Sequence, residues 1–153
     1  MDGSNGSSNT PVFVLVIIVL IALSAFFSAS ETALSSYNKA KMKSEAEDKK
    51  GKKARRVLEI GENYEKLIST ILIGNNIVNI VGASLATIFF VKLDPVNGVS
   101  ISSAVMTVLV LIFGEITPKV LAKQIPEAFC QLAALPLTIV SFIFKPLNML
   151  IKA

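Results

Sequence analysis

The chain has 153 residues and a net charge of +4; 52% of its residues are hydrophobic and 17% are charged, whereas about 25% are charged in an average soluble domain. The hydrophobic residues are clustered in long blocks, which predicts one membrane domain. The chain has no histidine, which excludes His-ligated zinc and haem sites and Ser-His-Asp or Cys-His catalysis. Its one cysteine, Cys130, cannot form an intrachain disulfide.

Positive charge is concentrated in one segment, because ten of the fifteen Lys and Arg residues lie between Lys39 and Lys66. A basic run of this kind can bind nucleic acid, but this one is flanked by apolar blocks on both sides. That position is typical of a cytoplasmic loop, since loops on the inner side of a membrane carry an excess of Lys and Arg. We therefore expect the lipid bilayer, and no nucleic acid, as a partner.

In chain order, the pattern begins with residues 1–10, a polar stretch rich in Gly, Ser and Asn that predicts a disordered extracellular tail. Three apolar blocks follow, each long enough to span a bilayer at about 1.5 Å per helical residue. Asp94-Pro95 and Asn97-Gly98 are turn signals that separate the second block from the third. The predicted spans are about 12–37, 67–91 and 99–122, with basic cytoplasmic helices at 38–66.

The last apolar segment, within 126–152, is interrupted by Pro136 and Pro146. Proline removes a backbone donor and usually kinks or ends a helix, so two juxtamembrane half-helices in the inner leaflet fit better than the alternative, a fourth full span. With the basic loop inside, the N-terminus lies outside and the C-terminus is cytoplasmic. We thus expect an all-α domain of the cell (plasma) membrane over 11–153, with three spans and juxtamembrane amphipathic or re-entrant helices.

The first of three polar clusters inside the predicted spans lies on one face of the first helix. It consists of Ser24, Ser28, Glu31 and Ser35, at spacings of four, three and four. A serine in a membrane helix often bonds back to its own carbonyls or packs against a neighbouring helix. A stripe of serines that includes an acid makes a functional site equally plausible.

The second cluster is a group of asparagines, Asn75, Asn76 and Asn79, in an otherwise apolar helix. Burying an unpaired amide costs about 2–7 kcal/mol, and hydrogen bonds between helices are the ordinary way to offset that cost. Three amides within five residues exceed what packing needs. Asn75 and Asn79 share a face, which makes them the candidates for a ligand site.

The third cluster contains Glu115, an acid in a membrane helix and so a functional-site hypothesis. Pro118 cannot donate a hydrogen bond to the carbonyl of Gly114, which leaves that oxygen free beside the carboxylate. Glycine at this position also leaves room for an ion to approach. The alternative is an ion pair between Glu115 and Lys119, one turn apart.

Hydroxyl, amide, carbonyl and carboxylate oxygens are hard ligands, so the three clusters together predict a site for Mg2+, Ca2+ or an alkali cation. A single carboxylate leaves a divalent ion under-neutralised, which suits an ion that must leave again. A Ser-Lys hydrolase using Ser28 and Lys119 would need an oxyanion hole that nothing in the sequence supplies. We therefore expect a protein that is not an enzyme.

The three clusters resemble the signature motifs of the CNNM/CorC family of magnesium transporters, in the same order and at similar spacing. The motifs are Ser24-Ala-Phe-Phe-Ser28-Ala-Ser30-Glu31-Thr32-Ala33-Leu34, Gly74-Asn75-Asn76-x-x-Asn79 and Gly114-Glu115-Ile116-Thr117-Pro118-Lys119. The resemblance covers nearly the whole chain after residue 10. It implies a homodimer of three-helix subunits, each with a cation site near the middle of the membrane that opens toward the cytosol.

The resemblance also implies a ligand set and a function. The implied ligands are Ser28, Asn75, Asn79 and Glu115, and their implied neighbours are Ser24 and the carbonyls of Gly74 and Gly114. The implied function is export of Mg2+, with Na+ entry as a candidate coupling. Family members carry a cytosolic pair of CBS domains that bind ATP, expected C-terminal to this chain, so no ATP site is expected within it. A membrane-embedded Mg2+ sensor or adaptor that regulates another transporter would use the same site and is the alternative function.

Overall fold

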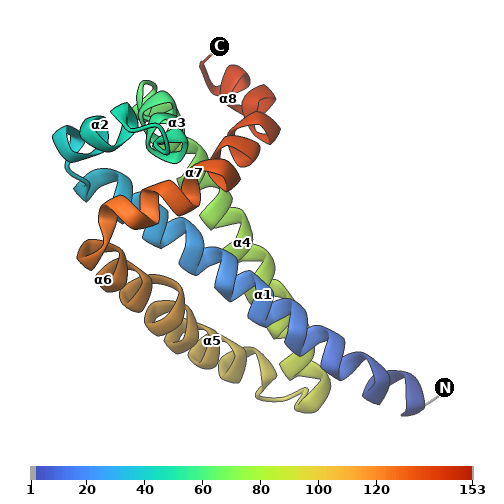
Figure 1. Ribbon diagram of the computed structural model, residues 1–153. Helices are drawn as coiled ribbons and strands as arrows, with labels where there is room; N and C mark the ends of the chain where they lie inside the picture. The colour runs from blue at the N-terminus through green and yellow to red at the C-terminus, as the bar shows by residue number, and fades with distance from the viewer. Residues whose placement is uncertain (1–2, 153) are drawn as a thin grey trace.

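The computed structural model describes residues 3–152, and every regular element in that range is a helix (Figure 1). This confirms the predicted all-α class. The helices in chain order are α1 (Gly3–Ser36), α2 (Lys39–Glu47), α3 (Lys52–Gly61), α4 (Tyr64–Leu93), α5 (Gly98–Leu109), the π-helix η1 (Val110–Ile116), α6 (Thr117–Gln124), α7 (Pro126–Ile143) and α8 (Lys145–Lys152).

Four helical segments of the described chain are long and apolar enough to cross a membrane: Thr10–Ser36, Tyr64–Leu93, Gly98–Gln124 and Pro126–Ile143. The first three overlap the predicted spans, with ends that differ from the predicted ones by at most three residues. The third consists of α5, η1 and α6 in direct succession. The protein is thus a multi-pass membrane protein.

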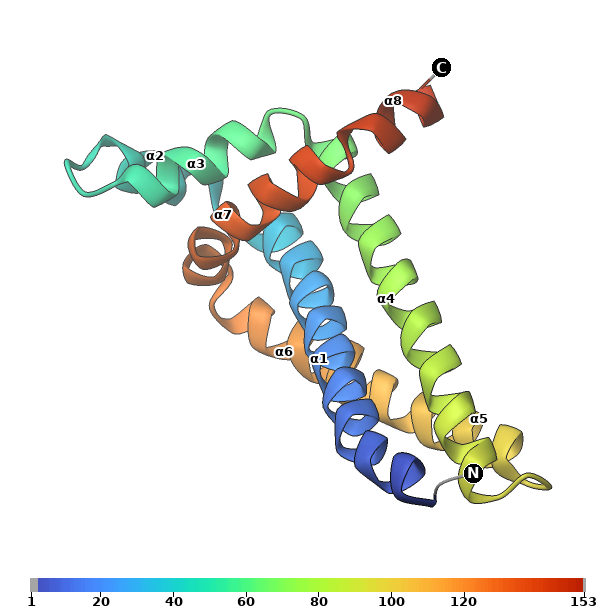
Figure 2. The ribbon, with the colours of Figure 1, turned by 90° about the vertical axis from the view of Figure 1, so that its right-hand side faces the viewer.

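Helix α1 is the centre of the bundle, since it packs against α4 on one side and against η1 and α6 on the other. Figure 2 shows α1 and α4 running side by side, with the third span beyond them. The outward faces carry large apolar side chains such as Val12, Leu15 and Ile80, which suits contact with lipid. Most of the buried positions described on α1 are instead small, including Ser24, Ser28 and Ala33, and small residues let membrane helices approach closely.

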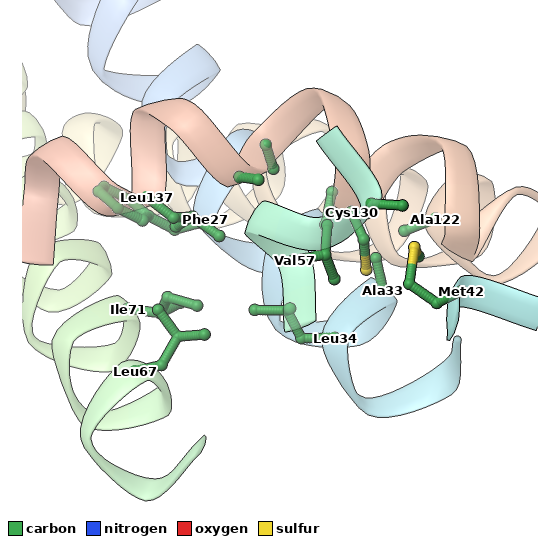
Figure 3. Close-up of a cluster of buried hydrophobic side chains, with 14 of the residues drawn as sticks. Phe27, Ala33, Leu34, Met42, Val57, Leu67, Ile71, Ala122, Cys130 and Leu137 are labelled. Atoms are coloured by element: carbon green, nitrogen blue, oxygen red, sulfur yellow. The ribbon is translucent and has the colours of Figure 1, made fainter. Parts of the chain in front are cut away.

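A compact apolar core joins the short helices α2, α3 and α7 to one end of the bundle (Figure 3). Met42 of α2, Val57 of α3 and Cys130 of α7 are all buried there against Ala33 of α1. Polar contacts add to it, since the Arg55 guanidinium donates to the Ala46 carbonyl at 3.0 Å. The basic segment is therefore folded onto the spans.

The polar tail differs from its prediction. Residues 3–10, predicted as disordered, are the first turns of α1, while residues 1–2 lie outside the described range. Gly, Ser and Asn are weak helix formers. Continuity with a long apolar helix nevertheless extends the hydrogen-bond ladder backwards, because propagating a helix is far easier than nucleating one.

The C-terminal segment also differs from its prediction. The chain does not break at Pro136: α7 is one helix of 18 residues with that proline inside it, and the interruption falls at Phe144. A proline removes only one hydrogen bond from the helix ladder. Cys130 and Ala133 before it and Leu137 after it are buried in the same core, which holds the helix together across the proline.

The position of α7 differs from that of the other three long helices. It crosses α1 and α4 near the end of the bundle that carries α2 and α3 (Figures 1 and 2). At the opposite end, α4 and α5 are joined by a tight turn in which an Asp94 carboxylate oxygen accepts hydrogen bonds from the backbone N–H groups of Val96 and Asn97, both at 3.1 Å. The hydrogen bond from the Asn97 backbone, with smaller help from the other contacts, lowers the pKa of Asp94.

Candidate cation site

Ser24 and Asn75 connect α1 to α4 in the middle of the bundle. The Ser24 hydroxyl, which is fully buried, donates to the Asn75 side-chain carbonyl oxygen at 2.8 Å. The same oxygen also accepts a longer hydrogen bond, 3.4 Å, from the Asn79 amide one turn further along α4. Two donors from two helices therefore converge on one amide oxygen, and a cation bound there would take their place.

Two other serines of α1 donate within their own helix. Ser30 and Ser35 donate to the carbonyls four residues earlier, at 2.7 and 2.9 Å, which is the ordinary behaviour of serine in a membrane helix. Ser24 donates to a side chain of another helix instead. A hydrogen bond within one helix therefore satisfies the Ser30 and Ser35 hydroxyls, whereas the Ser24 hydroxyl depends on α4.

Ser28 is the clearest anomaly, because its hydroxyl oxygen is buried and has no hydrogen-bond partner. Its side chain is 1% exposed. Ser28 lies one turn from Ser24 on the same face of α1. An unsatisfied buried polar group costs about 1–3 kcal/mol, and such groups in native proteins call for an explanation, of which an absent ion is one.

Gly114 brings the third span to the same place. A Cβ atom on Gly114 would lie 3.1 Å from the Ser24 hydroxyl oxygen, so the two residues are in close contact. Gly114 belongs to η1, whose register is shown by the Thr117 N–H bonding to the Ile112 carbonyl five residues earlier. Single π turns occur often at functional sites.

The π register affects which backbone carbonyl is left without a donor by Pro118. In an α register a backbone N–H at position 118 would donate to the carbonyl of Gly114, and in a π register it would donate to the carbonyl of Phe113. Because proline has no N–H, one of these two adjacent carbonyls lacks its helical donor. The sequence prediction named Gly114 alone, since it assumed an α-helix throughout.

Glu115 is half-buried, next to Gly114. Within the described residues it makes no ion pair with Lys119, so the structure does not support the alternative that the carboxylate is neutralised in its own helix. Nor does any hydrogen bond link it to the other predicted ligands in that part of the chain. Its carboxylate is thus uncommitted, and its neighbour in sequence, Gly114, lies against Ser24.

Three further residues named in the sequence analysis, Gly74, Ser35 and Asn76, have different surroundings. Gly74 is buried, but a Cβ atom on it would lie 2.9 Å from the ring of Phe27, so its small size serves helix packing. Ser35 lies at the end of the bundle, where its hydroxyl is 2.7 Å from that of Tyr64. Asn76 is exposed, consistent with its omission from the ligand set. The structure therefore brings Ser24, Asn75, Asn79 and Gly114 together.

Sequence reasoning missed a set of hydroxyl groups beyond Asn79. Thr87, Ser102, Ser103 and Thr107 line a cavity between α4 and the third span that Asn79 also borders. The available signal was the presence of these four polar residues in two apolar spans. Single hydroxyls in membrane helices are common, and nothing in the sequence shows that residues on two helices face each other.

The fold and the site define a class: a multi-pass α-helical membrane protein with a polar centre of oxygen groups between its spans. The chain belongs to the CNNM family, whose cyclin M transmembrane N-terminal domain matches residues 15–153. This confirms the family resemblance.

Bacterial relatives agree with that family. A UPF0053 protein of Haemophilus influenzae is 39% identical over 135 residues, which cover 87% of this chain and 31% of that protein. The UPF0053 inner membrane protein YfjD of Escherichia coli is 36% identical over 132 residues, 86% of this chain and 30% of that protein. A polyamine export protein of Salmonella typhimurium is 31% identical over 147 residues, 88% of this chain and 33% of that protein. The chain thus spans about a third of the length of these relatives, and the comparisons support a membrane transport or adaptor role.

Proposed function

We propose that this chain is the membrane core of a Mg2+ exporter, in which the ion passes through a site formed by Ser24, Ser28, Asn75, Asn79 and Glu115. The donor chemistry supports this: every group is an oxygen ligand, and hard oxygen ligands suit Mg2+ rather than zinc, copper or iron. The single observation that carries the proposal is the buried Ser28 hydroxyl without a partner, one turn from the Ser24 hydroxyl that donates to Asn75.

The charge of the site fits transport better than storage. Its one acid is Glu115, and the other groups are neutral amides, hydroxyls and carbonyls. One negative charge neutralises a divalent cation only in part, and a low-dielectric surrounding makes the remaining charge costly. Binding is therefore weak enough for release, as conduction through a membrane requires.

The proposal has further parts that rest on the family. We propose a homodimer, a site open to the cytosol, and export that uses Na+ entry. The basic segment 38–66 and the C-terminus lie in the cytosol, and a CBS pair that binds ATP follows this chain in the longer protein. The share of the relatives that the chain covers leaves room for such a domain.

Two other functions compete with this one. The first is polyamine export, which the name of the Salmonella relative favours. The site chemistry allows it, because amide, carboxylate and hydroxyl oxygens also accept hydrogen bonds from ammonium groups. An adaptor that binds Mg2+ without moving it would use the same residues. Reconstitution of the purified chain in liposomes distinguishes both alternatives from Mg2+ export.

The test uses the purified chain in liposomes, with Mg2+ flux followed by an entrapped fluorescent indicator and Mg2+ binding measured by calorimetry. Asn75→Leu removes the oxygen on which two donors converge, so we expect flux and affinity to fall at least tenfold. Asn76→Leu is the matched control, because Asn76 is the next residue on the same helix and is exposed. It should leave both unchanged.

The remaining outcomes separate the alternatives. Binding without flux would favour the adaptor, and flux of labelled spermidine without flux of Mg2+ would favour polyamine export. Equal effects of Asn75→Leu and Asn76→Leu would contradict the proposed site. Glu115→Gln, which removes the charge and keeps the shape, should weaken Mg2+ binding; unchanged flux would remove Glu115 from the site.

A further inference from the structure

The cavity between α4 and the third span shares one residue, Asn79, with the candidate cation site. It has a volume of about 300 Å³ and is lined by Asn79, Thr87, Ser102, Ser103 and Thr107 together with apolar side chains. None of its lining residues is charged. A volume of this size holds several waters, at roughly 30 Å³ each.

The hydroxyls in the cavity are organised across the two helices. The Thr87 hydroxyl of α4 donates to the Ala83 carbonyl of its own helix at 2.9 Å, and its oxygen lies 3.3 Å from the hydroxyl oxygen of Ser102 on α5. Ser102 is fully buried, so its hydroxyl faces the interior and not lipid. Hydroxyl groups that face each other across two membrane helices give a surface on which water or a partly hydrated ion can bind.

The course of the helices gives the cavity a direction. Helix α4 runs from Tyr64 past Asn79 and Thr87 to the turn at Asp94, and α5 returns from that turn. By their positions in these helices, Thr87 and Ser102 lie nearer the turn than Asn79 does, and Asn79 lies on the side of the cation site. Asn79 belongs to both places, since it borders the cavity and donates to Asn75.

We propose that this hydroxyl-lined cavity is the outer part of the cation pathway, through which the ion leaves the site toward the Asp94–Asn97 turn. The inference rests on the proposed function and adds to it the route of exit. Neutral oxygens without an acid can replace part of a hydration shell but cannot hold a divalent ion. The cavity is thus a passage, and the ion rests only at the site beside Glu115.

The first test is a pair of substitutions in the reconstituted chain. Thr87→Val with Ser102→Ala removes both hydroxyls with little change of shape. Mg2+ flux should fall tenfold or more, while the Mg2+ dissociation constant measured by calorimetry changes less than twofold. Thr138→Val is the matched control, because the Thr138 hydroxyl bonds to the Ala134 carbonyl of its own helix, away from the cavity. Retained binding also shows that the variant is folded.

The second test measures water access directly. In a Cys130→Ala background, Ser103→Cys places a thiol in the cavity, and Val108→Cys places one on the same helix outside it. A charged, membrane-impermeant thiol reagent should label Ser103→Cys from the side of the Asp94–Asn97 turn, at least tenfold faster than Val108→Cys. Labelling of both at the same slow rate would overturn the proposal.

The two proposals fail in different ways. If the unmodified chain moves Mg2+ and the Thr87→Val, Ser102→Ala variant moves it equally fast, the exit route is wrong and the transport function stands. If the unmodified chain moves no cation, both fail.

Discussion

Three buried glycines show how single atoms control the approach of the helices. A Cβ atom on Gly114 would lie 3.1 Å from the Ser24 hydroxyl, on Gly74 2.9 Å from the Phe27 ring, and on Gly82 3.7 Å from the Met106 methyl group. Only the last is an ordinary van der Waals distance. The neighbour on the facing helix therefore decides whether a side chain larger than glycine fits at each of these positions.

At Gly114 this geometry predicts a loss of binding. Gly114→Ala pushes a methyl group against the Ser24 hydroxyl and turns its oxygen away from the proposed ion position, and the loss of one neutral oxygen ligand, worth about 1 kcal/mol, corresponds to roughly fivefold weaker Mg2+ binding. Calorimetry on the purified chain measures this. Gly82→Ala is the control, since its methyl group has room, and it should bind as the unmodified chain does. Equal affinity of both variants would show that the contact between Gly114 and Ser24 is irrelevant to the ion.

The residues on one helix were predictable and the contacts between helices were not. The spacing of Ser24 and Ser28, and of Asn75 and Asn79, follows from the helical repeat alone. The contact of Gly114 with Ser24 joins two helices that are distant in sequence, and no periodicity contains it. The resemblance implied the Gly74 carbonyl as a ligand neighbour, and the structure adds that a Cβ atom on this residue would meet the Phe27 ring.

At the scale of elements, hydrophobic blocks predicted the spans because a bilayer demands long apolar helices. Three features depended on more than local sequence. The helix at residues 3–10 continues an apolar helix backwards, α7 persists through Pro136 because both sides pack in one core, and the π turn of η1 is a change of hydrogen-bond register that composition does not encode.

The packing of α1 on α4 gives a prediction about stability. Gly74→Ala forces a methyl group into the Phe27 ring, and overpacking of this kind costs about 1–3 kcal/mol. The thermal unfolding midpoint in detergent should fall. Phe27→Leu in the same chain makes space and should restore part of the loss. If Gly74→Ala leaves the midpoint unchanged and weakens Mg2+ binding instead, Gly74 belongs to the ion site.

At the scale of the whole molecule, polar contacts tie the beginning of α7 to the basic segment. The Gln131 amide donates to the Glu45 carboxylate, and the Asn38 backbone N–H donates to the Glu127 carboxylate at 3.3 Å. The buried Leu137 lies in the same core as Phe27 and Ile71. Because α7 is held along its length against one end of the bundle, we expect it to lie at that membrane surface and α8 to stay on the same side.

This arrangement predicts which sites a membrane-impermeant reagent reaches in intact cells. In a Cys130→Ala background, Val96→Cys, whose parent side chain is 89% exposed in the turn between α4 and α5, should be labelled from outside. Lys50→Cys in the basic segment and Met149→Cys in α8 should be labelled only after the membrane is permeabilised, because basic loops stay in the cytosol. Labelling of Met149→Cys in intact cells would instead mean that α7 crosses the bilayer as a fourth span, as its length and composition allow. Labelling of Lys50→Cys but not Val96→Cys in intact cells would mean that the topology is the reverse of the predicted one. The proposed exit route would then run in the opposite direction.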